Sequence, residues 1–141
     1  MSTHAFIAAQ QPNGTVRAIY LHSDGYVQHA GQTLVRHYMD PAKINALLDL
    51  GDLSVLGAEL GEKHNFNFPP KGVCNAYMRD REEVGFEAQT YRSRQSLADA
   101  GSNRHITYVY IFDGERWLVY LDGIQYGSMV VATSADPMSE A

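Results

Sequence analysis

The sequence predicts a single-domain α+β fold, in which an antiparallel sheet of five or six strands carries two consecutive helices packed across it. The dipeptides Asn13-Gly14 and Asp113-Gly114 each separate two strand-like runs, and such dipeptides are a strong β-hairpin signal because both residues tolerate positive φ angles. Between the two hairpins, apolar residues recur at helical spacing from residue 27 to residue 48. At 141 residues the chain fits one domain, 1–141, with a sizeable core.

The first hairpin is expected to join residues 5–10 to residues 16–22 through Asn13-Gly14. Side chains alternate between the two faces of a strand, and residues 16–22 carry apolar side chains on both faces. Tyr20 falls on one face and Leu21 on the other. A strand that is apolar on both faces is typical of the centre of a sheet.

Two helices are expected after this strand. In the first, over residues 27–39, the apolar positions follow helical spacing. Asp40 is a good N-cap for the second helix, since Pro41 then occupies the first helical position. Gly51 suits its C-terminal cap, and residues 52–54 are compatible with the start of one further helical turn.

Residues 61–72 lack periodicity and contain Pro69-Pro70, so a long loop is expected, and long loops in compact domains are often functional. The remaining chain is expected to alternate strands, turns and a short helix. The expected segments are a strand at 73–78 leading into a charged turn at 79–83, a strand at 84–92, helical turns at 93–101, a hairpin of 106–112 with 116–121, a strand at 124–132 and a frayed tail at 133–141.

Composition limits the possible partners. The formal net charge of -5 argues against an extended nucleic-acid footprint, although a local basic cluster could still hold one phosphorylated ligand. The N-terminus lacks the features of a signal peptide, and no apolar run approaches the ~20 residues that span a bilayer. Cys74 is the single cysteine, so an internal disulfide and a thiol zinc cluster are excluded. These observations predict a cytoplasmic protein with no membrane partner.

His22, Asp24 and Tyr26 form the first candidate site, because they lie where a central strand meets a helix and ligands often bind at such places. His22 could act as a base or a hydrogen-bond donor, and Asp24 could bind a metal or a ribose hydroxyl. Alternatively, Asp24-Gly25 is simply a turn, with Asp24 capping the following helix. The pattern leaves both interpretations open.

The second candidate site follows the proline-bearing loop and consists of Asn75, Tyr77, Arg79 and Arg81. The two arginines have the chemistry to bind a phosphate, and Tyr77 could stack on a base. The acidic residues among them could equally pair with the arginines and make an ordinary solvated turn.

Motifs of catalysis and metal binding are missing from the sequence. None of the six histidines forms the i, i+4 pair with a glutamate that marks a helical zinc site, so surface histidines are the simpler interpretation. No nucleophile elbow, phosphate-binding loop or Rossmann glycine pattern occurs either. We therefore predict no catalytic residue, no metal and no cofactor.

The segment from Ala18 to Glu83 resembles a family of small phage and prophage proteins. The resemblance rests on three stretches of this sequence, AIYLHSDGY, LGDLSVLG and AYMRDREE. The chain departs from the family pattern at Leu21, Ser23 and Val27, where the family has cysteine, tryptophan and proline. In its order of elements the chain is also similar to the sponge proteins that counter Thoeris defence by trapping cyclic ADP-ribose isomers.

The resemblance implies a phage-encoded counter-defence protein, and three functions follow as hypotheses. The first is a non-enzymatic accessory protein that binds and sequesters a small nucleotide-type signal. The second is a protein-binding inhibitor of a host defence complex, similar in role to an anti-CRISPR protein. The third is a small hydrolase that uses His22 and Asp24. A homo-oligomer is expected, since sheet proteins of this size often pair through their edges.

Overall fold

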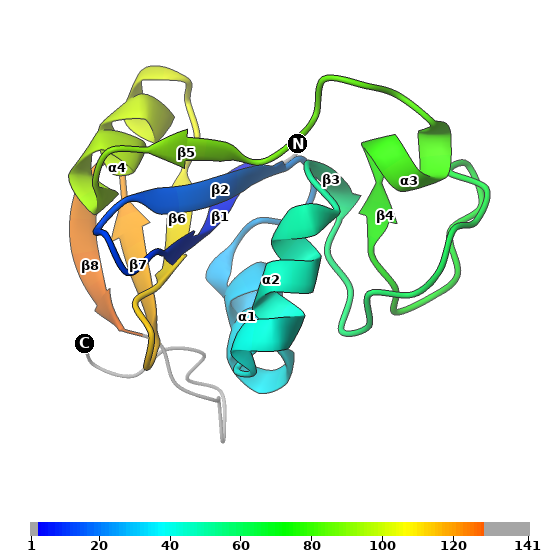
Figure 1. Ribbon diagram of the computed structural model, residues 1–141, viewed down its shortest axis with the longest axis horizontal. Coiled ribbons are helices and arrows are strands. Elements are labelled where there is room, and N and C mark those ends of the chain that lie inside the picture. The colour runs from blue at the N-terminus through cyan, green and yellow to red at the C-terminus, as the bar shows by residue number, and fades with distance from the viewer. Residues whose placement is uncertain (1–2, 129–141) are drawn as a thin grey trace.

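The computed structural model describes residues 3–128, which form one eight-stranded sheet with helices on both of its faces (Figure 1). The strands follow the order β4-β3-β2-β1-β6-β7-β8, and β5 pairs with β2 beside this path. The strands are β1 (Ala5–Gln10), β2 (Val16–Leu21), β3 (Leu53–Val55), β4 (Asn75–Ala76), β5 (Gln89–Tyr91), β6 (Tyr108–Phe112), β7 (Trp117–Leu121) and β8 (Ile124–Ser128). The helical segments are the π-helical turn η1 (Val27–Gly31), α1 (Gln32–His37), α2 (Pro41–Asp49), α3 (Tyr77–Arg81) and α4 (Arg94–Asn103).

The sheet is mixed, so the expectation of an antiparallel sheet of five or six strands is wrong in strand number and in direction. Strand β1 is antiparallel to β2 but parallel to β6, and β3 is parallel to β2. The helical connection from β2 to β3 accounts for the parallel pairing of these two strands, because a crossover through helices returns the chain in its original direction. Of residues 52–54, expected to be able to begin one further helical turn, Leu53 and Ser54 instead belong to β3.

The two predicted hairpin turns are confirmed. Asn13-Gly14 joins β1 to β2, and Gly14 adopts a φ of 91°. Asp113-Gly114 joins β6 to β7, and Asp122-Gly123 joins β7 to β8. Of the strand expected at 124–132, the structure describes 124–128, and the remainder lies outside the described residues together with the tail at 133–141.

The helix pair is confirmed with one change. The first helix begins as the π-helical turn η1 before it continues as α1. Asp40 caps α2 by accepting a hydrogen bond from the amide of Ala42 at 3.0 Å, and Gly51 follows this helix with a φ of 79°. Of the turn expected at 79–83, residues 79–81 belong to helix α3 and Glu82 caps its end, and the helical turns expected from Ser93 form α4. None of the helices within residues 3–128 is long and apolar enough to cross a membrane.

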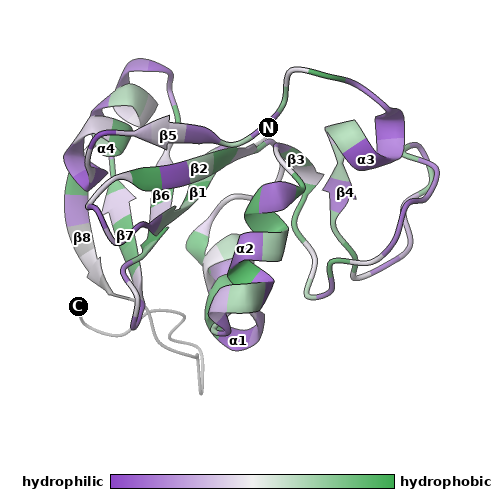
Figure 2. Ribbon diagram, in the orientation of Figure 1, coloured by the Kyte–Doolittle hydropathy of each residue, from purple (hydrophilic) through white to green (hydrophobic). Residues whose placement is uncertain are grey.

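The sheet separates two hydrophobic layers. One layer lies between the sheet and the helices α1 and α2, and Figure 2 shows hydrophobic and hydrophilic residues side by side on α2, as expected of a helix that buries one face. Trp117 of β7 lies fully buried in this layer, and its indole N–H donates to the carbonyl of Tyr38 at 2.8 Å. The second layer lies between the opposite face and α4, where Leu97 and Ala98 are fully buried.

Residues 57–88, which we call the α3 lobe, lie beside the β3 edge of the sheet (Figure 1). The lobe contains β4, α3 and the predicted loop 61–72. Tyr38, at the end of α1, connects the helix layer to this lobe, because its hydroxyl donates to the carbonyl of Gly57 at 2.7 Å. The lobe therefore packs against the core at the end of the sheet where β2, β3 and β4 meet.

Candidate functional site

Both groups of predicted site residues lie at the same end of the sheet, on either side of β3. His22 follows β2, and its amide donates to the carbonyl of Leu53 at 3.0 Å. Tyr77 follows β4, and its amide donates to the carbonyl of Asp52 at 3.3 Å. The two segments are 55 positions apart in the sequence, yet a single strand separates them.

A cluster of three polar rings forms on the α4 side of this end. The hydroxyl of Tyr20 lies 2.9 Å from Nδ1 of His22 and 3.1 Å from Nδ1 of His4. The two imidazole rings stack with their centroids 4.8 Å apart. His4 was not among the predicted site residues, although the hairpin register that pairs Ala5 with Leu21 places it opposite His22.

The nearby Tyr77 belongs to the same face. Ser54 alternates with the core residue Leu53 along β3 and forms a hydrogen bond with Tyr77. Burial raises the pKa of Tyr20, and the hydroxyl of Tyr77 and the carboxylate of Asp52 are close enough to raise it further. Burial likewise raises the pKa of Tyr77. Both phenols therefore act as neutral hydrogen-bonding groups at neutral pH.

Asp24 and Tyr26 continue the turn that follows β2. Asp24 is exposed and adopts a φ of 56°, which suits a turn residue, and the helical segment η1 has no side-chain cap. Gly25 fixes the turn, because its amide donates to the carbonyl of Thr3 and its carbonyl accepts from the hydroxyl of Tyr110. Within residues 3–128, no hydrogen bond joins His22 to Asp24, and the imidazole of His22 lies instead 2.9 Å from the hydroxyl of Tyr20.

Arg79 has a structural role in place of the predicted phosphate contact. Its guanidinium donates to the carbonyls of Leu60, Gly61 and Cys74 at 2.8, 3.2 and 2.8 Å. It also donates to both carboxylate oxygens of Asp80, at 2.8 and 3.1 Å. These contacts use all five N–H groups of an arginine, so none remains for a ligand.

Asp80 and Asn75 complete this internal network. The carboxylate of Asp80 is buried and also accepts from the amides of His64 at 3.1 Å and Ala76 at 2.8 Å. The side chain of Asn75 lies 2.8 Å from Nε2 of His64 and donates to the carbonyl of Phe66 at 3.1 Å. Both residues therefore hold the loop 61–72 onto α3, and Asn75 is buried rather than exposed to a ligand.

The lowered pKa of Asp80 predicts that the folded protein loses stability in acid. Burial opposes ionisation, but the hydrogen bonds from Arg79, Ala76 and His64 outweigh it and lower the pKa below its ordinary value. As pH falls, the unfolded chain takes up this proton first, near pH ~4, so we expect stability to fall from there through the folded pKa. Urea unfolding between pH 7 and pH 3 measures the loss. In Asp80→Asn the free energy of unfolding should fall less steeply as pH decreases. An unchanged dependence on pH would contradict the prediction.

Arg81 and Tyr77 belong to a half-buried aromatic cluster, which also contains Phe66 and Phe86. The guanidinium of Arg81 lies 4.6 Å from the ring centroid of Phe66 and 4.7 Å from that of Tyr77. Tyr77 also stacks on Phe86, with the centroids 5.1 Å apart, so its ring is already in contact with other side chains. The Nε of Arg81 donates to Glu83, while its terminal nitrogens make no hydrogen bond within the described part of the chain. With the side chain 43% exposed, these nitrogens can reach a ligand.

The end of the sheet thus combines an accessible guanidinium, aromatic rings, and a hydroxyl bonded to two imidazoles. This set can bind an anionic, ring-bearing molecule. Among residues 3–128, no group of three or more His, Cys, Asp or Glu side chains is placed to hold a metal ion. No protein-family model matches the chain, and comparisons with curated proteins and with solved structures likewise find no match.

Proposed function

We propose that this chain is a non-enzymatic accessory protein of phage origin that binds and sequesters a small nucleotide-type signal. The observation that carries the proposal is the guanidinium of Arg81, which lies over two aromatic rings and keeps its terminal nitrogens open to a ligand. Guanidinium groups bind phosphates through paired N–H donors, and aromatic rings stack on bases.

The geometry supports a revised assignment of roles. Arg81 holds a phosphate, and the rings of Phe66 and Tyr77 contact the base. Across β3, His22 and Tyr20 supply an imidazole and a hydroxyl for the sugar or for a second phosphate. The adjoining turn, with Asp24 and Tyr26, borders the bound ligand on this polar side. Arg79 and Asn75 act as positioning residues, because their hydrogen bonds fix the loop that carries Phe66.

Replacement of Arg81 tests this assignment. We expect Arg81→Gln to weaken the binding of ADP-ribose, or of its cyclic isomers, by about tenfold or more, because a charge-assisted hydrogen bond contributes about 1.5–3 kcal/mol. Isothermal titration calorimetry measures the affinity. The matched control is Arg92→Gln, which makes the same charge change at an exposed position between β5 and α4. Equal affinity in both variants would refute the role of Arg81.

Native mass spectrometry addresses the ligand itself. The full chain is purified from phage-infected and from uninfected cells and measured without denaturation. A mass above an integer number of chains, released on denaturation and nucleotide-like on fragmentation, supports sequestration and also gives the oligomeric state. Bare protein in both samples contradicts it.

A second candidate, a protein-binding inhibitor of a host defence complex, is favoured by two exposed apolar side chains of the α3 lobe. Phe68 is 78% exposed and Val84 is 87% exposed, and large apolar side chains at the surface are frequent in protein interfaces. This candidate predicts a stable complex in a pull-down from host lysate that is lost in Phe68→Asp. Capture that is unaffected by this change argues against the lobe as the binding surface.

A further inference from the structure

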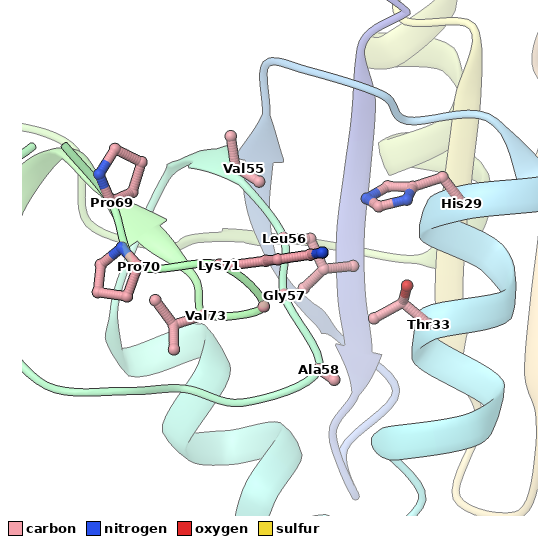
Figure 3. Close-up of a pocket in the computed structure, with 11 residues that line it drawn as sticks. His29, Thr33, Val55, Leu56, Gly57, Ala58, Pro69, Pro70, Lys71 and Val73 are labelled. Carbon is pink, nitrogen blue, oxygen red and sulfur yellow. The ribbon is translucent and has the colours of Figure 1, made fainter. Parts of the chain in front are cut away.

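A pocket of about 320 Å³ lies between the helical segments η1 and α1 and the α3 lobe (Figure 3), and no residue of the aromatic cluster lines it. One wall comes from η1 and α1, with His29 and Thr33, and the opposite wall comes from residues 69–73 of the α3 lobe. Residues 55–58, at the end of β3, form the floor between them. The volume is within the range of small-molecule sites, which starts near ~300 Å³.

His29 brings an unsatisfied polar atom to this pocket. Its Nε2 is buried and has no hydrogen-bond partner in the part of the chain that the structure describes. A buried polar nitrogen without a partner is unfavourable and rare, and it points to a ligand or a water that completes it. His29 lies in the π-helical turn η1, and such turns are frequent at functional sites.

Two further polar groups converge on the same space. Thr33 follows His29 by four residues, one helical turn along the same wall, and Figure 3 shows its hydroxyl pointing toward the imidazole ring. From the opposite wall, Lys71 extends its amine across the pocket toward both side chains (Figure 3). The polar groups are thus a cation, a hydroxyl and an imidazole nitrogen, which together suit an anion.

The remainder of the lining is apolar. Leu56 is buried in the floor, and Val73, Pro69 and Pro70 line the wall of the lobe. A ligand that fits this lining carries one anionic group beside an apolar body. A fully hydrated inorganic ion would leave the apolar wall without a partner.

The pocket is held in shape by the residues beneath it. A Cβ atom on Gly57 would lie 2.5 Å from the carbonyl carbon of Val73, so the floor and the lobe wall approach as closely as their backbones permit. The carbonyl of Gly57 is fixed by the hydroxyl of Tyr38, and the amide of Glu59 donates to the carbonyl of Gly72 at 3.1 Å. The site is therefore formed before any ligand enters it.

We infer that this pocket is a second ligand site, which binds a small molecule with an apolar body and one carboxylate or phosphate group. Lys71 pairs with the anionic group, Thr33 donates its hydroxyl to it, and the free Nε2 of His29 hydrogen-bonds to the bound molecule. The inference does not depend on the nucleotide site, because none of the residues assigned to that site lines this pocket.

The test uses benzoate and phenyl phosphate as probes and benzyl alcohol as a neutral probe of similar shape. Each probe is titrated into the full chain, and amide and histidine-ring NMR signals are followed. We expect shifts confined to the pocket lining, including the ring nitrogens of His29, and an affinity for at least one anion about tenfold or more above that for benzyl alcohol. Preference for benzoate identifies a carboxylate ligand, and preference for phenyl phosphate identifies a phosphate ligand.

Two lysine variants test whether the anionic group binds at Lys71. Lys71→Met keeps the aliphatic stem and removes the charge, so the anion should bind about tenfold or more weakly. Lys63→Met makes the same change at an exposed lysine that pairs with Glu82 outside the pocket lining. This variant should bind the anionic probe with the same affinity as the unsubstituted chain. The inference is overturned if no pocket signal moves at ~10 mM probe, if benzyl alcohol binds as well as the anions, or if Lys71→Met leaves the affinity unchanged.

Discussion

Replacing Asp80 with alanine is expected to lower the free energy of unfolding by about 3–5 kcal/mol. The buried carboxylate accepts hydrogen bonds from two backbone amides and from two nitrogens of Arg79. Its removal leaves a largely buried guanidinium without its counter-charge and frees the amides of His64 and Ala76. Loss of a buried charge partner costs far more than loss of a solvated one, because the remaining charge stays in a poorly hydrated place.

Urea unfolding with a matched control checks this expectation. Asp49→Ala also removes one member of an arginine–aspartate pair, but Asp49 is exposed and contacts Arg17 at the surface. That change should cost no more than about 1 kcal/mol. If the two variants lose similar stability, Asp80 does not organise the α3 lobe as its contacts indicate.

Gly57→Ala is expected to lower the free energy of unfolding by about 2–3 kcal/mol and to open the pocket next to it. The new methyl group would lie 2.5–2.7 Å from three backbone atoms of Gly72 and Val73. Backbone atoms cannot rotate away, so the wall of the lobe must move and the hydrogen bond from Glu59 to Gly72 must lengthen or break. Differential scanning calorimetry measures the loss of stability, and hydrogen exchange of the amide of Glu59 reports the displacement.

The control for this change is Gly101→Ala in α4. There the new Cβ approaches side-chain atoms, the nearest being Cγ2 of Val109 at 3.1 Å, and alanine favours a helix over glycine by ~1 kcal/mol. We expect little net change in stability. A comparable loss of stability in both variants would show that the close backbone contact at Gly57 does not make this substitution more destabilising than the one at Gly101.

Local signals in the sequence predicted much of the fold. The two hairpin dipeptides and the Asp40 cap act over a few residues, so they can be recognised without knowing the rest of the chain. Strand β3 was missed because its three residues are too few to show an alternating pattern. The parallel pairing of β1 with β6 was missed because nothing in residues 5–10 specifies which distant strand becomes the neighbour.

The candidate site shows the same limit. Arg79 and Arg81 are alike in sequence, but α3 directs the first toward the carbonyls of the folded loop and the second toward half-buried aromatic rings. The sequence could not distinguish them, because the acceptors of Arg79 come from residues 60, 61 and 74. His29 was interpreted as a surface residue for the same reason, since the opposite wall of its pocket lies about forty residues further along the chain.

The parallel pairing of β1 with β6 has a consequence for how the chain folds. Strand β1 lies between β2 and β6, and its partners in β6 are roughly a hundred residues away in sequence, so closing this pair carries a large entropic cost. During synthesis the β1–β2 hairpin emerges early, yet one hydrogen-bonding edge of β1 stays unpaired until β6 has been made. The molecule therefore cannot complete its sheet piece by piece, and β6 joins its two halves in a late, cooperative step that we expect to limit the folding rate.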